Sequence, residues 1–312
     1  MTDSAPVPAV LVPRELDGQR VAPGLWELAV RGSFDLGQTL NFGFGQRSAT
    51  PEGPLRMAFC VDGLQEQAAV AVFSPHVGVL RIGIDGDGDP AAVLNQVARI
   101  LSVDVDGTGY DALGRTDELV GRLQQARPGL RPPLFHSAYE ALCWSVLSAR
   151  RPAAQMAELR TRLSRARGRV FHLDGVEVAA FPTPDQLLSV SEFPGLPEVK
   201  LQRLHAVAEA ARQGRLDTDA LRSLDPGKAA AELQRLPGIG PFYSELVTVR
   251  TLGHTDLMPT AEVGAATMAG SLTGRTLDAA GLAEFAAGWS PWRTWVCVAL
   301  RAAGPLVLES SP

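Results

Sequence analysis

The first third of the chain alternates short apolar runs with turn residues. Between residues 25 and 84 the runs are rich in Val, Leu, Ile and Phe, and Gly, Pro, Asp and Ser separate them. Runs of this length and composition predict β-strands. The predicted strands are 25–30, 36–44, 55–61, 68–73 and 77–84. Because the connections are short, we expect these strands to pair as an antiparallel sheet.

One helix is predicted to cover this sheet. Asp89 and Pro90 provide an N-cap and a first-turn proline. Apolar residues then recur on one helical face, namely Val93, Leu94, Val97, Ile100 and Leu101. A strand-rich segment with a helix on one face is typical of an α+β domain, which we place at residues 1–115. Residues 1–20 show no clear period and are expected to form a loose leader.

From residue 116 the pattern is almost entirely helical, which predicts a second, all-α domain over 116–312. Ser137 and Glu140 have the spacing of a capping box, and Thr183-Pro184 has the composition of another helix start. Gly214 is expected to end a long helix. The whole chain is therefore predicted to be α+β, with a sheet domain followed by a helical domain.

The C-terminal helix is predicted to begin at Ser290-Pro291, as a cap and a first-turn proline. An apolar stripe follows, made of Trp292, Trp295, Val296 and Ala299. Residues at this spacing lie on one face of a helix. We expect these tryptophans to belong to the core and not to a platform for stacking bases.

Two helices flank a glycine-containing hairpin in the second domain. Asp225-Pro226 predicts the start of the first helix, and Pro241 starts the second. The second helix is expected to bury Phe242, Leu246 and Val249. Because glycine leaves no Cβ in the way, the linker 237–240 can bring its N–H groups and a helix N-terminus against a phosphate. A plain helical corner with a packed isoleucine is the alternative.

Composition narrows the classes of protein that remain. The chain has 312 residues, which is long enough for two domains with full cores. Cys60, Cys143 and Cys297 are too widely spaced to suggest a disulfide framework or a zinc site, and they fit a reducing cytoplasm. The sequence predicts no signal peptide, and no apolar run reaches the roughly 20 residues of a membrane helix.

The net charge of −5 argues against nucleic acid as a partner, but phosphate binding needs only a local basic surface. Residues 150–169 provide one candidate. This stretch holds Arg150, Arg151, Arg160, Arg162, Arg165, Arg167 and Arg169 against the single acid Glu158. It is interpreted either as a DNA contact or as a solvated basic helix face.

The hairpin is followed by a short loop over 257–264, which carries one carboxylate, Glu262. This order of helix, LPGIG hairpin, helix and carboxylate loop resembles the helix-hairpin-helix (HhH-GPD) DNA glycosylase superfamily. The passages 121–131, 181–184 and 289–293 resemble more specifically the AlkA-type 3-methyladenine DNA glycosylase II. The resemblance covers roughly residues 116–301, and the N-terminal segment matches the family in architecture.

The resemblance implies a monofunctional base excision repair enzyme. It would flip a damaged base out of duplex DNA and hydrolyse its N-glycosidic bond, with Glu262 in the position of the catalytic aspartate. Members that also cut the strand carry a lysine where this chain has Phe242, so Schiff-base chemistry is not expected. Damaged double-stranded DNA is the implied partner, and a cytoplasmic monomer with no membrane association is expected.

The same resemblance assigns binding residues. DNA contacts are implied for Leu236, Pro237, Gly238, Ile239, Gly240 and Arg150. A base pocket is implied for Phe242, Leu246, Val263 and Arg301. No cofactor or catalytic metal is implied, although in the family hairpin carbonyls hold a monovalent cation, here at 236–241.

Several positions depart from the family pattern. Glutamate is one methylene longer than aspartate, and Ala261 replaces a second aspartate. Ala149 and Arg150 stand where the family has a glutamine and an apolar wedge that fills the gap left by the flipped base. Leu246, Val263 and Arg301 are not aromatic, which weakens stacking on a cationic base.

Three hypotheses follow from the matches and departures. The first is an active glycosylase with a remodelled pocket that favours neutral lesions, such as deaminated or etheno-bridged bases. The second is a catalytically weak or inactive protein that binds damaged DNA through the hairpin and the Arg-rich stretch. The third is a helical protein with an unrelated function.

Overall fold

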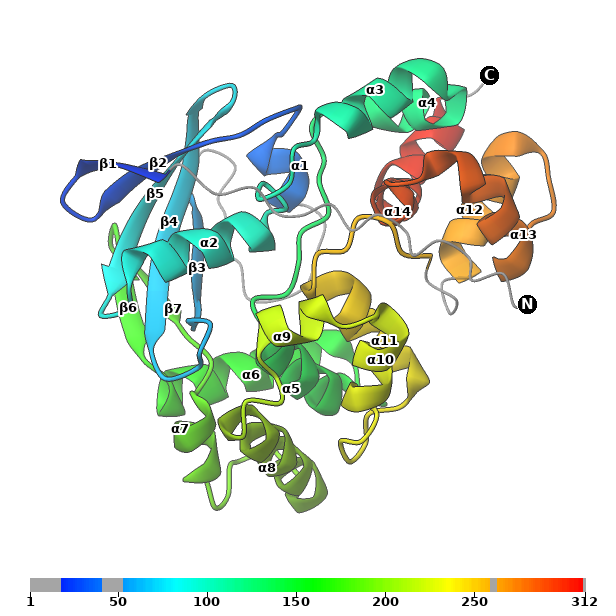
Figure 1. The fold of residues 1–312 in the computed structure, drawn as a ribbon. Coiled ribbons are helices and arrows are strands. Elements are labelled where there is room, and N and C mark those ends of the chain that lie inside the picture. The colour runs from blue at the N-terminus through cyan, green and yellow to red at the C-terminus, as the bar shows by residue number, and fades with distance from the viewer. Residues whose placement is uncertain (1–17, 41–52, 259–262, 311–312) are drawn as a thin grey trace.

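The computed structural model describes residues 18–40, 53–258 and 263–310. A five-stranded antiparallel sheet lies on one side of the molecule and helices fill the rest (Figure 1). Its order is β1-β2-β5-β4-β3, with β1 (Gly18–Ala22), β2 (Leu25–Ala29), β3 (Leu55–Cys60), β4 (Gln67–His76) and β5 (Val79–Gly86). The predicted antiparallel sheet is confirmed, because every pairing in it is antiparallel.

One predicted strand is wrong. Within the predicted strand 36–44, helix α1 (Leu36–Leu40) forms, and residues 41–44 lie outside the described residues. The cause is local hydrogen bonding by Asp35. Its side chain accepts from Gln38 N at 2.9 Å, and its carbonyl accepts from both Thr39 N and Thr39 Oγ1. Such side-chain capping offers the backbone an alternative to a strand ladder.

Helix α2 (Pro90–Ile100) crosses one face of the sheet, as predicted (Figure 1). Asp89 caps it by accepting from Ala91 N at 3.1 Å, and Pro90 occupies its first turn. Its apolar residues and the inward-facing residues of the strands form one core, which includes Val93, Val97, Leu28 and Val70.

The remaining helices follow α2 along the chain, and the first of them begins within the segment 1–115 that was predicted as the sheet domain. They are α3 (Thr108–Thr116), α4 (Glu118–Ala126), α5 (Ala138–Ser148), α6 (Ala153–Arg167), α7 (Pro184–Leu188), α8 (Glu198–Arg212), α9 (Thr218–Ser223), α10 (Pro226–Leu233), α11 (Pro241–Thr251), α12 (Val263–Thr273), α13 (Ala279–Phe285), the 3₁₀ helix η1 (Ala286–Trp289) and α14 (Arg293–Glu309). Gly214 follows α8 at φ +74°, which confirms the predicted end of that helix. Thr183 and Gln186 form a full capping box at α7.

The segment after residue 116 also contains a β-hairpin, which was not predicted from its sequence. It consists of β6 (Val170–Leu173) and β7 (Val176–Ala179). Asp174 and Gly175 make its two-residue turn at φ +49° and +76°. An Asp-Gly pair between apolar runs is a strong hairpin signal, and here it was outweighed by the helical pattern around it.

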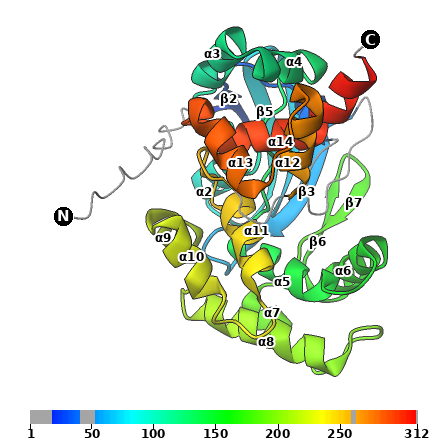
Figure 2. The ribbon, with the colours of Figure 1, turned by 90° about the vertical axis from the view of Figure 1, so that its right-hand side faces the viewer.

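The helices pack in two groups with separate cores. The first core joins α5, α6, α8, α10 and α11, and the second joins α3, α4, α12, α13 and α14. Helices α3 and α4 therefore lie beside the C-terminal helix α14, far from α7 and α8 (Figure 1 and Figure 2). The division at residue 115 stays a prediction.

Within the described residues no helix has the length and apolarity needed to cross a membrane.

The predicted start of the last helix is wrong. Helix α14 begins at Arg293, after Trp292, and Ser290-Pro291 precedes it. The reason is that Ser290 Oγ donates to Asp256 Oδ2 at 2.8 Å instead of accepting from the first turn of the helix. The expected buried stripe is confirmed, because Trp292 and Trp295 are at most 5% exposed and pack in the second core.

Candidate functional site

The hairpin is anchored by its apolar residues. Asp225 caps α10 by accepting from Gly227 N at 2.9 Å, and Ile239 N donates to Leu236 O at 3.1 Å to close the turn. Leu236 and Ile239 are buried in the first helical core. Gly238 has φ +86°, a conformation that favours glycine. The buried side chains therefore hold a backbone turn whose exposed part is Pro237 and Gly238.

The N-terminus of α11 is open. Gly240 is its N-cap residue and makes no side-chain capping bond, and Pro241 occupies the first turn. A Cβ added to Gly240 would meet nothing within 4 Å. Gly240 also has φ −96°, which other residues adopt readily. The fold itself therefore does not require glycine here. The N–H groups of the first turn and the positive end of the helix dipole are available to an anion.

The proposed base-pocket residues have different environments. Phe242 is 57% exposed, so the prediction that α11 buries it is wrong. It lies in the first turn, where α11 extends beyond the core, and it meets Tyr243 edge to face with ring centroids 5.3 Å apart. Leu246 is half-buried and Val249 is buried, as expected. Val263 is 69% exposed at the start of α12.

Glu262 lies outside the described residues, together with Ala261. Arg301 is exposed on α14, which packs against α12. The structure therefore brings Val263 and Arg301 onto neighbouring helices. Phe242 and Leu246 belong to α11, in the other helical group.

The segment that leads to Glu262 is clamped to the start of α14. The carboxylate of Asp256 accepts from Arg293 Nε at 2.7 Å, Arg293 Nη2 at 2.9 Å and Ser290 Oγ. Burial alone would raise the pKa of Asp256, but the hydrogen bonds from Arg293 and Ser290 outweigh burial and lower that pKa. Leu257 N also donates to Thr294 Oγ1 at 2.7 Å.

This clamp was missed by sequence reasoning, although Arg293 lies in one of the passages that resemble the family. The carboxylate that binds Arg293 is 37 residues away along the chain, and no local pattern marks it. The clamp fixes residues 256–257, close to the loop that carries Glu262. Arg293 and Asp256 are therefore candidates for positioning that loop.

Arg150 occupies a constrained loop between α5 and α6. It is exposed and has φ +56°, a left-handed conformation that is uncommon for residues other than glycine. Lys200 Nζ from α8 donates to Val146 O at 2.9 Å, to Ala149 O at 3.1 Å and to Leu147 O. These bonds satisfy carbonyls at the end of α5 and hold the backbone immediately before Arg150.

The Arg-rich stretch is not one continuous basic face. Arg160 is buried and donates to Glu140 at 2.5 Å, and Arg162 donates to Pro194 O at 3.3 Å. Arg165 pairs with Glu177, and Arg169 pairs with Asp87. Four of its seven arginines therefore serve the structure of the protein itself. Arg150, Arg151 and Arg167 are exposed, and the first two lie together in the loop before α6.

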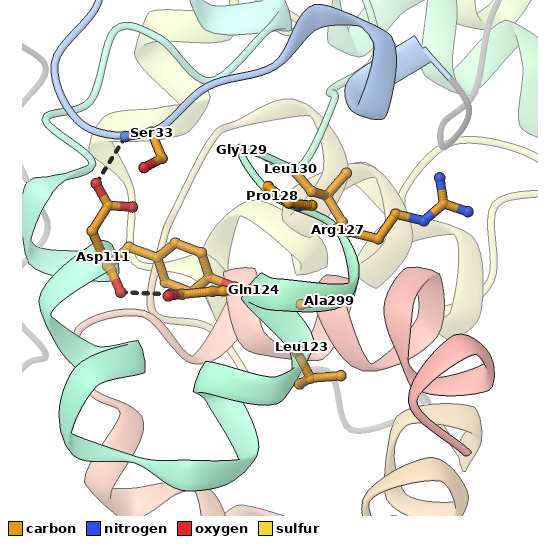
Figure 3. A pocket seen from close by; sticks show the side chains of 10 residues that line it. Ser33, Asp111, Leu123, Gln124, Arg127, Pro128, Gly129, Leu130 and Ala299 are labelled. Carbon is orange, nitrogen blue, oxygen red and sulfur yellow. Dashed lines mark hydrogen bonds between the residues drawn. The ribbon is translucent and has the colours of Figure 1, made fainter. Parts of the chain in front are cut away.

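A cavity of about 110 Å³ lies elsewhere, between α3, α4 and the loop after α4 (Figure 3). Asp111 accepts from Ser33 N at 2.8 Å on one wall, and Gln124 donates to Tyr110 O at 2.7 Å. None of the residues predicted for the site lines it. The cavity is smaller than the usual 300–1,000 Å³ of ligand sites, so we do not assign the function to it.

No metal centre is apparent in the parts of the chain that the structure describes, since no group of three His, Cys, Asp or Glu side chains there is arranged to hold a metal ion.

No protein family model matches the chain. It is 28% identical over 225 residues to the Mycobacterium tuberculosis protein named "Probable bifunctional transcriptional activator/DNA repair enzyme AlkA", covering 70% of this chain and 44% of that protein. It is also 28% identical to DNA-3-methyladenine glycosylase 2 of Escherichia coli over 181 residues, which are 56% of this chain and 61% of that enzyme. The chain thus spans about half the length of these curated relatives.

A solved structure extends the similarity to almost the whole fold. The 3-methyladenine DNA-glycosylase from Archaeoglobus fulgidus superposes with a TM-score of 0.72 at 18% identity, covering 90% of this chain and 98% of the other. At this level of identity the superposition establishes the fold. The chain is therefore a homologue of the AlkA-type 3-methyladenine DNA glycosylases and has the helix-hairpin-helix glycosylase fold.

Proposed function

We propose that this protein is a monofunctional DNA glycosylase that releases alkylated or otherwise damaged bases from duplex DNA. The observation that carries the proposal is the open hairpin, in which Gly240 leaves space beside an uncapped helix N-terminus. A backbone phosphate fits such a site because N–H groups and the helix dipole both favour an anion. The names of the two relatives above, a DNA repair enzyme and a DNA-3-methyladenine glycosylase, support the same activity.

In the proposed reaction the damaged base leaves the stack and Arg150 fills the space that it vacates. A flipped base exposes its glycosidic bond to water, at the cost of unstacking. Glu262 would stabilise the positive charge that develops on the sugar. Phe242 stands where strand-cutting relatives carry lysine, so water and not an amine is the nucleophile. Release of a free base, without strand cleavage, is the expected product.

The pocket residues favour neutral lesions in this proposal. Phe242 offers an exposed ring for stacking, whereas Leu246 and Val263 supply only aliphatic surface. A cation such as Arg301 disfavours a positively charged base wherever the two come close. We therefore expect hypoxanthine or ethenoadenine to be released faster than 3-methyladenine. Single-turnover base release from duplexes that carry each lesion tests this order and the activity itself.

A second candidate function is damage binding without efficient catalysis. It is favoured by Glu262 and Ala261, which replace both family aspartates. Salt-dependent binding of lesion-containing duplexes without base release would support it. In either case we propose that the protein acts as a cytoplasmic monomer and that carbonyls of the hairpin 236–241 hold a monovalent cation.

The hairpin contact predicts a specific loss of affinity in Gly240→Ala. The added methyl group meets nothing within the protein, so stability to urea should stay within about 0.5 kcal/mol of wild type. The methyl group would instead stand where the phosphate approaches, and duplex affinity should fall by about tenfold or more. Fluorescence anisotropy at fixed salt measures this effect.

Gly288→Ala is the matched control, because Gly288 also has nothing within 4 Å of an added Cβ and lies on η1, away from the hairpin. It should leave DNA affinity unchanged. Equal affinity of Gly240→Ala and wild type would remove the hairpin from the interface.

The variant Arg150→Gly distinguishes a structural role of Arg150 from its proposed role as the wedge that fills the space left by the flipped base. Glycine relieves the left-handed conformation at φ +56°, so the fold should be unchanged or more stable by up to about 1 kcal/mol. Loss of the side chain should still slow base release by about tenfold, because filling the vacated space offsets part of an unstacking cost of a few kcal/mol. Unfolding in urea and single-turnover release measure the two effects. A variant that is stabler and equally fast would contradict the wedge role.

A further inference from the structure

Arg203 on α8 lies against the hairpin. A Cβ added at Gly238 would come within 2.8 Å of Arg203 Cδ and 3.0 Å of its Nε. Arg203 is half-buried, and the hairpin turn beside it is exposed. No DNA contact was predicted from the sequence of α8. The structure therefore adds a cation at the edge of the proposed phosphate site.

Two more cations share this region. Lys200 stands one turn before Arg203, with its ammonium on the carbonyls at the end of α5. Burial lowers the pKa of Lys200, and the charges of Arg151 and Arg203 lower it further. Since both arginines act on the same ammonium, Arg151, Lys200 and Arg203 form one cluster of positive charge. This cationic cluster links the hairpin to the loop that presents Arg150.

The cluster is not neutralised by the part of the chain that the structure describes. Other arginines on the same helices and nearby loops, namely Arg165, Arg169, Arg212 and Arg215, have carboxylates at 2.5–3.2 Å. Among the described residues no carboxylate lies within ion-pair distance of Arg151 or Arg203. Like charges held close together repel one another. A polyanion that binds beside them is attracted by all of them and compensates this repulsion.

The three cations differ in whether their N–H donors are already used within the protein. Lys200 uses its three N–H donors on Val146, Leu147 and Ala149, so its ammonium is not available to a phosphate. The guanidinium groups of Arg151 and Arg203 make no such hydrogen bonds to any residue that the structure describes, and a guanidinium can bind two phosphate oxygens at once. Lys200 therefore positions the loop, and the two arginines provide N–H donors that no described residue uses.

We infer that Arg203 and Arg151 bind backbone phosphates of the DNA strand next to the phosphate held by the hairpin. The strand then runs from Gly238 and Gly240 across α8 to the loop of Arg150. This inference rests on the proposed function and adds phosphate contacts on a helix that carries none of the sequence-predicted residues. Contacts of this kind raise affinity for any sequence and set the register of the duplex.

The test is the salt dependence of binding to an undamaged duplex. Each phosphate contact that is lost lowers the slope of log K against log salt by about 0.9 in magnitude. We expect that reduction in Arg203→Gln and in Arg151→Gln, and about 1.8 in the double variant. Arg165→Gln is the control, since Arg165 is paired with Glu177, and its slope should equal that of wild type. Arg203→Lys keeps the charge and should restore most of the slope.

The outcomes separate this inference from the proposed function. A steep slope for wild type that neither glutamine variant changes overturns the inference and leaves DNA binding intact. Absence of binding by wild type at low salt overturns both. If Arg203→Gln weakens binding with an unchanged slope, Arg203 acts by packing against Gly238 and the inference is wrong.

Discussion

Glu262→Gln is expected to abolish detectable base release while leaving duplex affinity unchanged. Glutamine preserves the size of the side chain and removes the negative charge that would face the developing positive charge of the sugar. Loss of a preorganised electrostatic group of this kind costs on the order of 10²–10³-fold in rate. Single-turnover release with enzyme in excess measures it, on duplexes that carry 3-methyladenine, 7-methylguanine, hypoxanthine or ethenoadenine.

Two further variants give this experiment its controls. Glu284→Gln removes an exposed carboxylate on α13 and should leave release unchanged. Glu262→Asp restores the family residue but withdraws the carboxylate by one methylene. If the loop is built for glutamate, this variant should lose on the order of 10²-fold, because a 1 Å displacement has that cost. Equal release by wild type and Glu262→Gln would exclude the catalytic role. No release by wild type, with binding intact, would favour the damage-binding protein.

Glu140→Ala is expected to lower the free energy of unfolding by about 3–5 kcal/mol. Glu140 is buried on α5 and accepts from Arg160 Nη2 at 2.5 Å and from Cys60 N at 3.0 Å, with His136 Nδ1 at 3.2 Å. Removing the carboxylate leaves the charge of Arg160 buried without a partner. The change also removes a hydrogen bond between α5 and the sheet, because Cys60 belongs to β3. Urea unfolding at pH 7 measures the loss.

The same carboxylate should make stability fall at acidic pH. Burial alone would raise the pKa of Glu140, but His136, Arg160 and the Cys60 N–H outweigh it and lower that pKa. A carboxyl whose pKa is depressed by folding stabilises the protein above its unfolded-state value of about 4.3. That contribution is lost as the pH falls through the lower, folded-state value. In Glu140→Gln this part of the acid dependence should be absent.

Glu177→Ala is the matched control for the stability experiment. Glu177 also pairs with an arginine of α6, but its side chain is 42% exposed and that of Arg165 is 56% exposed. Solvent-exposed pairs contribute about 0–1 kcal/mol. If Glu140→Ala costs no more than Glu177→Ala, the buried pair does not hold the sheet to the helices.

Signals carried by a few adjacent residues were sufficient for much of the fold. The cap at Asp89, the break at Gly214 and the hairpin between α10 and α11 all follow from local backbone chemistry, and the structure has them in place. Local reasoning failed where two local signals competed. Asp35 caps a helix inside a predicted strand, and Asp174-Gly175 turns a hairpin inside a helical region.

Only part of the candidate site could be predicted from the sequence. The order of motifs identified the hairpin, but it could not show that Phe242 is exposed or that most arginines of 150–169 serve internal contacts. The spacing of apolar residues shows which residues share one face of a helix. It does not show where along its length the helix extends beyond the core. The first turn of α11 extends beyond the core, which is why Phe242 is free to face a ligand.

Local sequence patterns were enough for four of the five strands of the large sheet, for the caps at Asp89, Thr183 and Asp225, for the hairpin and for the homology, because each leaves a characteristic spacing or composition within a few residues. The tertiary structure alone decided which charges meet. Asp256 binds Arg293 across 37 positions, Glu140 binds Cys60 N across 80, and Arg203 reaches Gly238 from another helix. Such contacts exist only after helices and sheet have packed, since packing sets both the distance between the groups and their removal from water.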